Sequence, residues 1–416
     1  MARILLLSYH FPPFNVIASQ RPWAYFQYLP EYGHEVDVAT MDWKALPEGN
    51  GYAISEGNGL ISEQADHGTV YRLRTQFEKG RSIGKREQIK RWRKGKLDAV
   101  SLDNVEEAYH RFLTNHLASH RYDLILGIFS PHFHLKHSAE FGDRFDIPYV
   151  LDFRDLWSNR IIHRQYKPSL GLRLEDHFIG KHWRKWLGGS SFATITSKPW
   201  ADLLQGYSTS PVEVVRNGYI EEEMPSKGAC STPLISYVGS MYQDQRWDMI
   251  LQGIKEALSQ QEFQIQFIGS DIPSSGEGLT ARLKDPKQRI TKYLSKDQFR
   301  ITEKLPREKA LKALSNSSIL LFASFPDIPG WYSGKFLEYL GSGTPILVAP
   351  DDHSVVGEAI RETGAGRVAN SSEEIAAAIR SMLSEPVEVN QERLSEYSRK
   401  AQVAHLAQLI QKHITL

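Results

Sequence analysis

The sequence predicts an α/β protein built from two Rossmann-like domains that face each other across a cleft. Short apolar runs alternate with amphipathic segments along most of the chain, as in parallel strands joined by helical crossovers. The alternation begins at residues 4–8 and restarts at 234–239, after the turn signal Arg216-Asn217-Gly218. A chain of 416 residues also exceeds what one hydrophobic core usually supports. The expected segments are 1–217, 218–390 and 391–416.

Seven apolar runs predict the sheet of the first domain. They lie at residues 4–8, 33–39, 69–73, 123–128, 147–152, 192–196 and 212–215. Helices are expected at about 21–32 and around 172–187, because apolar residues recur there at helical spacing.

The second domain repeats the same alternation. Its clearest strands are expected at 234–239, 263–269, 319–323 and 345–349, with a helix at about 247–258. Residues 392–415 predict one long amphipathic helix with no strand after it. We expect this last helix to return to the first domain and to strap the two domains together.

The bulk composition excludes several classes of protein. A net charge of +1 argues against a dedicated nucleic-acid binder. Cys230 is the only cysteine, so a disulfide within the chain is impossible and a cytosolic setting is the simplest inference. No apolar stretch is long enough to span a bilayer, and residues 4–8 are too short for a signal peptide. We expect a cytoplasmic protein, either soluble or peripheral on the inner face of the plasma membrane.

The most informative stretch is residues 334–345. It places Lys335 and Glu338 at the start of a helix between two apolar runs, in a predicted βαβ unit. Ligands of open α/β sheets bind at the carboxyl ends of strands, and a helix N-terminus favours anions there. This pattern predicts a phosphate clamp at Lys335 and a ribose contact at Glu338. The alternative is a solvated ion pair on the helix surface.

Residues 79–96 form a strongly basic segment. Lysines and arginines surround Ile83, Ile89 and Trp92, with Glu87 as the only acid. Such segments are attracted to anionic lipid head groups. The alternative is a mobile, solvated loop. A second cluster at residues 182–187 has a similar mixture of cations and tryptophans.

With these features the chain resembles the GT-B glycosyltransferases, specifically the retaining family GT4, over nearly its whole length. In the first half the similar motifs are residues 8–13, Arg21, 28–36, 130–132 and 152–157. In the second half they are 217–218, 237–240, 267–269 and 334–345. Each motif is weak alone, but all occur in order and each lies at a strand end.

The resemblance implies that the second domain binds a nucleotide-sugar donor and the first presents the acceptor. Lys335, Arg246 and Arg154 take the catalytic positions. The donor-binding positions are Gly239, Ser240, Gly269, Leu305, Gly334, Phe336 and Glu338. The acceptor-binding positions are Phe11, Arg21, His132, His134, Asp152 and Asp155.

The residues themselves also allow structural alternatives to several of these functional roles. Backbone N–H groups of Gly239 and Ser240 could approach a diphosphate, with Arg246 pairing with it, or Gly239 could simply form a tight turn. His132 and His134 could be ordinary hydrogen-bonded histidines. Asp152 and Asp155 could neutralise Arg154 in a structural ion pair.

Three positions depart from the family pattern. Gly330 stands where many relatives carry a glutamate that contacts the donor sugar, so donor-sugar contacts must differ. Ser240 replaces an arginine, and Arg154 aligns with a histidine beside the reacting centre.

The implied reaction is sugar transfer with retention from a nucleotide sugar, UDP-sugar first and GDP-sugar next, to a glycan or lipid-linked acceptor. Cell-surface polysaccharide or glycoconjugate biosynthesis is the expected setting. No cofactor or metal is expected, since Asp351-Asp352-His353 is better explained as a loop or helix cap. Two alternatives are a sugar-nucleotide epimerase of the same fold and a non-catalytic subunit of a polysaccharide assembly complex.

Overall fold

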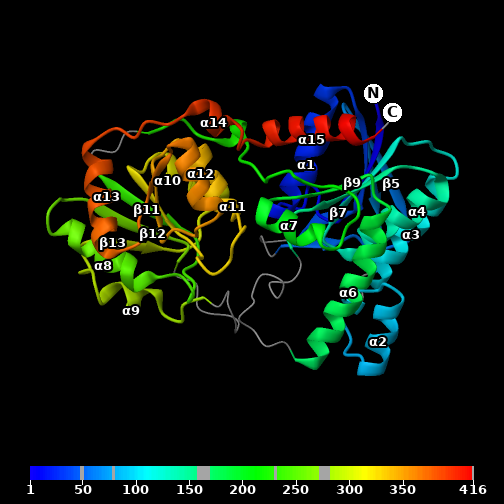
Figure 1. The fold of residues 1–416 in the computed structure, drawn as a ribbon, viewed down its shortest axis with the longest axis horizontal. Helices are drawn as coiled ribbons and strands as arrows, with labels where there is room; N and C mark the ends of the chain where they lie inside the picture. Colours follow the sequence, from blue (N-terminus) through cyan, green and yellow to red (C-terminus); the bar gives the residue numbers. More distant parts are fainter. Residues whose placement is uncertain (47–50, 77–79, 157–168, 229–231, 271–281, 415–416) are drawn as a thin grey trace. The chain divides into compact units, whose positions relative to one another are not determined.

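The chain divides into two compact units (Figure 1). The structure is a computed structural model that describes residues 1–46, 51–76, 80–156, 169–228, 232–270 and 282–414. Unit 1 contains residues 1–216 and 402–416, and unit 2 contains residues 217–401. Within the described part of the chain, no helix has both the length and the apolar character needed to cross a bilayer.

Unit 1 is built on an eight-stranded sheet with helices on both faces (Figure 1). In spatial order its strands are β10 (Val212–Val214), β9 (Phe192–Ile195), β8 (Tyr149–Phe153), β7 (Leu124–Phe129), β1 (Arg3–Leu7), β2 (Glu35–Met41), β6 (Gly68–Leu73) and β5 (Leu60–Ala65). All neighbours are parallel except β5, which runs antiparallel to β6. Every one of the seven predicted runs forms a strand.

The sequence did not reveal β5 or the small hairpin of β3 (Trp43–Ala45) and β4 (Tyr52–Ile54). β5 lies at the edge of the sheet and is mostly exposed, so its residues need not be apolar. Periodicity therefore gave no signal for it.

The described helices of unit 1 connect these strands. They include α1 (Gln20–Tyr28), α2 (Lys85–Arg93), α3 (Asp103–His116), α4 (His132–Phe145), α6 (Leu170–Gly188) and α7 (Lys198–Gln205). The predicted helix at 21–32 changes after Tyr28 into a 3-10 turn, η2 (Leu29–Tyr32), with Pro30 in its first turn. Gly33 ends it with φ of +81°, a conformation that glycine adopts without strain.

The single helix predicted at 392–415 is wrong in detail. The chain forms α14 (Gln391–Ser395) and α15 (Arg399–His413), with a turn at Glu396 and Tyr397 between them. In this connection Tyr397 and Ser398 leave the helical path because the backbone pairs with Tyr219, whose N–H donates to Tyr397 O over 3.1 Å. From Val403 onward, α15 packs its apolar face into the core of unit 1.

Unit 2 contains a parallel six-stranded sheet in the order β13-β12-β11-β14-β15-β16. These strands are β13 (Phe299–Thr302), β12 (Gln264–Ile268), β11 (Leu234–Val238), β14 (Ile319–Ala323), β15 (Ile346–Ala349) and β16 (Gly366–Val368). Its described helices are α8 (Trp247–Leu258), α9 (Pro286–Thr291), α10 (Arg307–Ser315), α11 (Gly334–Gly341), α12 (Val355–Thr363) and α13 (Ser372–Ser384). The strand order reverses between β11 and β14, which is where such sheets form ligand sites.

Candidate functional site

Lys335 lies in the first turn of α11, directly over the end of β11. Its Nζ donates to Tyr237 Oη over 2.9 Å and lies 4.3 Å from the centre of the same ring. Burial against this ring lowers the pKa of Lys335 to about 7. Among the described residues no carboxylate lies within ion-pair distance of it. The site therefore holds a desolvated ammonium group that lacks an anionic partner.

The N-terminus of α11 offers further donors beside this amine. Ser333 is the N-cap residue, but its side chain does not cap the helix. Its Oγ is buried without a hydrogen-bond partner in the described structure. Uncapped N–H groups and the positive end of the helix dipole favour an anion at this point.

Two glycines open the space in front of Lys335. Gly239 follows β11 with φ of +120°, and a Cβ there would lie 3.4 Å from Lys335 Nζ. Gly269 follows β12 with φ of +72°, and its Cβ would lie 4.0 Å from Gly239 Cα. The N–H of Gly239 donates to Ile268 O over 2.8 Å, so the prediction that it binds a diphosphate is wrong. The carbonyl of the next residue, Ser240, accepts from Tyr237 Oη over 2.7 Å.

Gln245 is a buried residue that the sequence did not single out, and it fixes the loop before Arg246. Its Nε2 donates to Ala323 O at the end of β14 over 2.7 Å, while its Oε1 accepts from Tyr242 N over 3.0 Å. This anchors the loop to the carboxyl edge of the sheet. Arg246 follows as the N-cap residue of α8, with a side chain that is 60% exposed and 3.8 Å from Asp327. An exposed ion pair at this distance contributes little to stability, so the guanidinium of Arg246 remains available to bind a ligand.

Glu338 lies one turn after Lys335 and pairs with Arg307, at the start of α10. Arg307 also contacts Glu223, with Nε 3.0 Å from Oε2. Glu338 is thus held in a Glu223–Arg307–Glu338 cluster rather than being a solvated partner of Lys335. Arg307 was not predicted as a site residue, although it lies two positions after Leu305, a predicted donor-binding residue.

The other predicted donor residues lie around this cluster with different exposures. Gly334 begins α11, and Leu305 is half-buried just before α10. Phe336 has no exposed surface and packs against Phe322 with ring centres 5.1 Å apart. A donor contact by the Phe336 side chain is therefore wrong, because its ring belongs to the core.

The position of the missing glutamate lies next to an aromatic cluster. The N–H of Gly330 donates to Ser354 Oγ over 3.0 Å. The next residue, Trp331, lies 4.8 Å from Phe325, and Phe325 lies 5.6 Å from Tyr242. Aromatic faces thus stand near the place where relatives carry a carboxylate.

Asp352 caps α12, as expected. Its carboxylate accepts the backbone N–H groups of Ser354, Val356 and Gly357 over 2.8 to 3.2 Å. Asp351 pairs with Arg361 over 2.8 Å. Across the described ranges, no group of three or more His, Cys, Asp or Glu side chains is arranged to hold a metal ion.

In unit 1, Arg21 and Asp152 form a fully buried ion pair. Arg21 Nε donates to Asp152 Oδ2 over 2.8 Å, and Nη1 donates to the carbonyl of Arg216 over 3.0 Å. Phe11 is also buried, between Trp23 and Phe26. The prediction that these three residues contact an acceptor is wrong, because no part of them reaches solvent; they tie β1, β8 and α1 together.

The two predicted histidines are buried as well. His132 begins α4, where Asp98 accepts its N–H over 2.9 Å and that of Phe133 over 3.0 Å. Asp98 therefore fills the anion site of this helix N-terminus. His134 Nδ1 lies 2.9 Å from the carbonyl oxygen of Ile128, and burial lowers the pKa of His134 to about 3. Both are structural histidines, the alternative that the sequence left open.

Polar groups remain accessible at the end of β8. Arg154 pairs with Asp155 over 2.6 Å, and the two side chains are 26% and 39% exposed. Burial and the nearby charge of Arg154 lower the pKa of His10 to about 4, so this imidazole is neutral at pH 7. His10 follows β1 and lies in the motif at residues 8–13, but the sequence did not predict a function for it. Asp152 pairs with Arg21 instead, so only Asp155 neutralises Arg154.

Part of the basic segment is helical, since α2 covers Lys85–Arg93, whereas residues 80–84 and 94–96 lie outside this helix. α2 lies beside α6 (Figure 1), where His182 Nε2 is 2.7 Å from the carbonyl oxygen of Trp92. The ring of Trp92 lies 6.1 Å from that of Phe178, so it is partly engaged within the protein. Arg91 is buried and pairs with Asp103. Lys79 and Trp157 lie outside the described residues.

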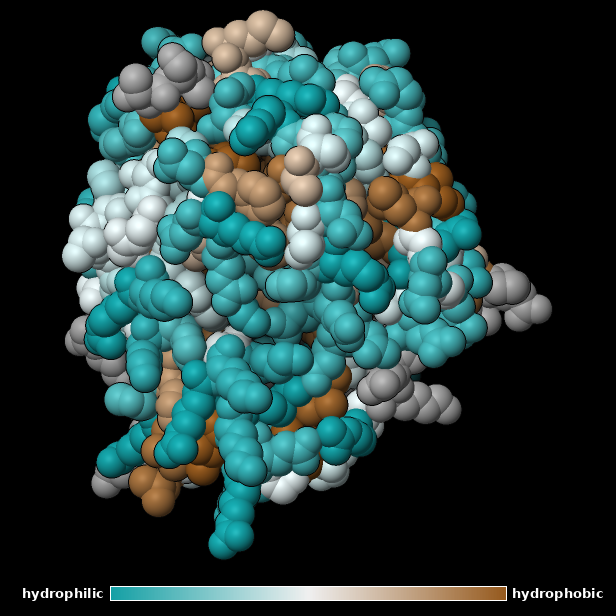
Figure 2. Space-filling model, turned by 90° about the vertical axis from the view of Figure 1, so that its right-hand side faces the viewer, coloured by the Kyte–Doolittle hydropathy of each residue, from teal (hydrophilic) through white to brown (hydrophobic). Residues whose placement is uncertain are grey.

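We call the exposed cations of α2 and the exposed leucines of α6 the α2–α6 surface. It comprises Lys85, Arg86, Lys90, Arg93, Lys94, Leu170 and Leu174. Leu170 is 76% exposed and Leu174 39%, and their spacing of four residues places them on one helix face. Figure 2 shows long hydrophilic side chains and hydrophobic patches together at the lower end of this face of the molecule.

Comparison with known proteins agrees with this geometry. Residues 232–385 match the family described as "Glycosyl transferases group 1". All seven predicted donor-binding positions lie in this region, as do the predicted catalytic residues Lys335 and Arg246. No curated protein matches the chain in sequence.

Solved structures match the chain over nearly its full length. Sucrose-phosphate synthase from Thermosynechococcus elongatus aligns with a TM-score of 0.63 and 16% identity, covering 99% of both chains. The chain has the GT-B fold. HepE from Anabaena, solved in complex with UDP, aligns with a TM-score of 0.58 and 11% identity, covering 99% of this chain and 100% of its own. The UDP-forming α,α-trehalose-phosphate synthase from Burkholderia vietnamiensis aligns with a TM-score of 0.54 and 12% identity, over 99% and 100% of the two chains.

Proposed function

We propose that this protein is a retaining glycosyltransferase of the GT4 type that uses a nucleotide-sugar donor, UDP-sugar first and GDP-sugar next. The observation that carries the proposal is Lys335. It is a desolvated amine without an anionic partner in the described structure, at an uncapped helix N-terminus and facing two glycines. A diphosphate supplies the missing charge and accepts the free backbone donors.

The residues suggest a mechanism of positioning and charge stabilisation. As the bond between the sugar C1 and the diphosphate oxygen breaks, negative charge grows on the leaving group. Protonated Lys335 and the accessible guanidinium of Arg246 stabilise it. The acceptor hydroxyl attacks C1 from the side of the departing group, and its proton passes to a phosphate oxygen, so no protein nucleophile is needed.

Glu338 and the aromatic cluster are assigned to the rest of the donor. The carboxylate of Glu338 accepts hydrogen bonds from the ribose hydroxyls, and Arg307 holds it in place. Trp331 and Phe325 offer apolar faces to the donor sugar in place of the glutamate that Gly330 replaces. UDP is favoured over GDP because HepE, which shares the fold, was solved with UDP.

For the acceptor we propose a glycan or a lipid-linked glycan in cell-surface polysaccharide or glycoconjugate biosynthesis. Arg154, Asp155 and neutral His10 are the accessible polar groups that meet it in unit 1. The α2–α6 surface carries five exposed cations and two exposed leucines, which suits reversible adsorption to an anionic membrane. Such adsorption would place the protein on the cytoplasmic face of the plasma membrane.

A two-stage experiment tests the proposal. Thermal shift with UDP, GDP, ADP and dTDP identifies the base, because a ligand at a hundred times its Kd stabilises by about 2.7 kcal/mol. The matching nucleotide sugar is then incubated with candidate acceptors with and without EDTA, and NMR gives the anomeric configuration of the product. Transfer with retention that survives EDTA supports the proposal, and inversion refutes it.

The two alternatives give different outcomes. An epimerase changes the donor sugar when no acceptor is present. A non-catalytic subunit shows neither nucleotide binding nor turnover, which the unpaired charge of Lys335 argues against.

A further inference from the structure

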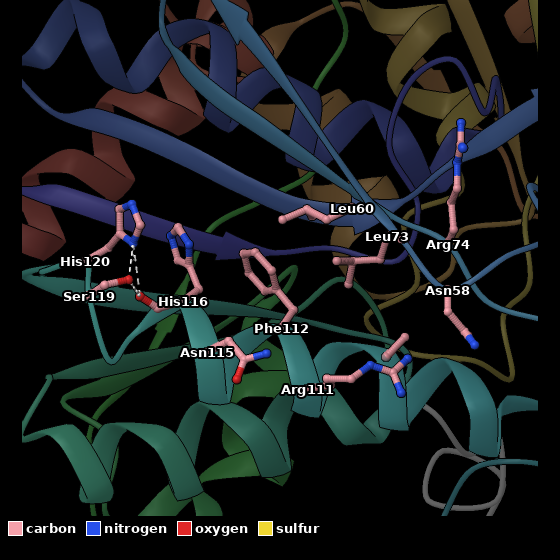
Figure 3. Close-up of a pocket in the computed structure, with 12 residues that line it drawn as sticks. Asn58, Leu60, Leu73, Arg74, Arg111, Phe112, Asn115, His116, Ser119 and His120 are labelled. Carbon is pink, nitrogen blue, oxygen red and sulfur yellow. Dashed lines mark hydrogen bonds between the residues drawn. The ribbon is translucent and has the colours of Figure 1, made fainter.

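A groove of about 550 Å³ lies in unit 1, between α3 and the edge of the sheet formed by β5 and β6 (Figure 3). It contains none of the residues assigned above to donor or acceptor. β6 is four strands away from β8, which Asp155 follows in the chain, so the groove lies about 19 Å from that strand at the usual strand spacing. Its volume is in the range of ligand-binding sites.

The floor of the groove is apolar and its sides are polar. Leu60 and Leu73 come from the paired strands, and Phe112 projects from α3 toward them (Figure 3). Leu60 is 48% exposed, which is unusual for a leucine in a sheet of this size. Asn58 and Asn115 provide amide groups beside this floor.

The charge of the groove is positive. Arg111 and Arg74 line it, and no carboxylate does. Arg74 pairs with Asp42 over 2.8 Å, whereas Arg111 forms no ion pair within the described parts of the chain. Arg111 is therefore the cation that an anionic ligand would meet.

His116, at the far end of the groove, is neutral near pH 7. Burial and the neighbouring His120 lower the pKa of His116 to about 4. Tyr122 donates its hydroxyl proton to Asp37 over 2.7 Å. Because that proton is used, Tyr122 Oη can only accept from His116 Nε2, which lies 2.8 Å from it. His116 therefore adds no positive charge near pH 7, and Arg74 and Arg111 are the arginines that line the groove.

The shape of the groove favours a chain over a compact molecule. Ala108 and His116 both line it and are eight residues apart on α3, which corresponds to about 12 Å. A lipid tail would require a continuous apolar lining, but amides, Ser119 and His120 interrupt this one. Sugars present both apolar faces and hydroxyl edges, which match a leucine and phenylalanine floor between polar sides.

We propose that this groove binds an acidic oligosaccharide, with the apolar faces of the sugars on Leu60 and Phe112 and a carboxylate or phosphate on Arg111. This is a second glycan contact, separate from the reacting site. It does not depend on sugar transfer, because it rests on unit 1 alone.

Calorimetry on the full chain tests the proposal with tetragalacturonate as the acidic probe and maltotetraose as the neutral one. We expect tetragalacturonate to bind at least tenfold more tightly than maltotetraose, and the difference to shrink with salt. Arg111→Gln should raise the Kd for tetragalacturonate by tenfold or more. Arg144→Gln, an exposed arginine on α4 that does not line the groove, is the matched control and should bind like the wild type.

A second variant and a lipid probe distinguish the remaining outcomes. Leu60→Asp places a negative charge on an exposed position and should abolish tetragalacturonate binding while circular dichroism stays unchanged. Equal binding by wild type and Arg111→Gln, or no binding of tetragalacturonate at millimolar concentration, overturns the proposal. Binding of a soluble short-chain phosphatidylglycerol in place of the glycan overturns it too and assigns the groove to a lipid.

Discussion

Nucleotide affinity should fall steeply as the pH rises above 7, because the cation in the donor site titrates there. Burial against Tyr237 lowers the pKa of Lys335 to about 7 in the free protein. A bound diphosphate favours the protonated form and raises this pKa. The last pKa of the phosphate is about 6, so the charge of the ligand changes little above pH 7. Binding therefore weakens as the pH rises above 7, because Lys335 loses its proton there.

The size of the effect follows from the protonated fraction. With a pKa of about 7, half of the amines are protonated at pH 7 and about one in a hundred at pH 9. Because apparent affinity scales with the binding-competent fraction, Kd should rise about fiftyfold between these pH values if the complex stays protonated. That is somewhat more than 2 kcal/mol, at 1.4 kcal/mol for each factor of ten.

Calorimetry with the nucleoside diphosphate at pH 6, 7, 8 and 9 measures this directly. Lys335→Met should bind weakly and show a flat profile, and Lys335→Arg should bind with a flat profile because an arginine stays charged. A change in wild-type Kd of less than threefold, or the same slope in Lys335→Met, would refute the role given to Lys335.

Three further predictions concern other parts of the molecule. Glu338→Gln should weaken binding of the nucleoside diphosphate by about tenfold but leave pyrophosphate binding unchanged, since an amide accepts weaker hydrogen bonds from the ribose. Parallel titrations with the two ligands measure this difference. An equal loss of affinity for both ligands would contradict a ribose contact. Arg21→Met should lower the free energy of unfolding by about 3 to 5 kcal/mol, because Asp152 is left buried without its partner. Denaturant-induced unfolding measures this change. A loss below 1 kcal/mol would show that the Arg21–Asp152 pair does not stabilise the fold. Replacing the exposed cations of the α2–α6 surface by glutamine should abolish salt-sensitive sedimentation with anionic liposomes. Lys198→Gln, which removes an exposed cation elsewhere in unit 1, is the single-site control. If the multiple variant and the wild type sediment alike, the α2–α6 surface does not bind membranes. This variant changes Lys85, Arg86, Lys90, Arg93 and Lys94 and keeps Arg91, which is buried.

The sequence by itself determined the fold class and which residues lie together on the short helix after β14. Apolar runs located the parallel strands because these strands are buried on both faces and tolerate little else. The block at 334–345 predicted that Lys335 and Glu338 lie on one short helix after a strand, and α11 has them there, because this spacing is a local property. The positive φ angles of Gly239 and Gly269 are likewise local, since each is set by the turn that follows its strand.

Only the tertiary structure decided which polar residues are free to act. Arg21, Asp152, His132 and His134 are as polar in the sequence as Arg154, and their burial depends on strands and helices far away in the chain. Arg307 and Gln245 gained their roles in the same way, through partners dozens of residues distant. The groove beside β5 also required the fold, because an exposed edge strand leaves no periodic signal. Sequence patterns report which residues share a local element, whereas solvent access and pairing arise from contacts between elements.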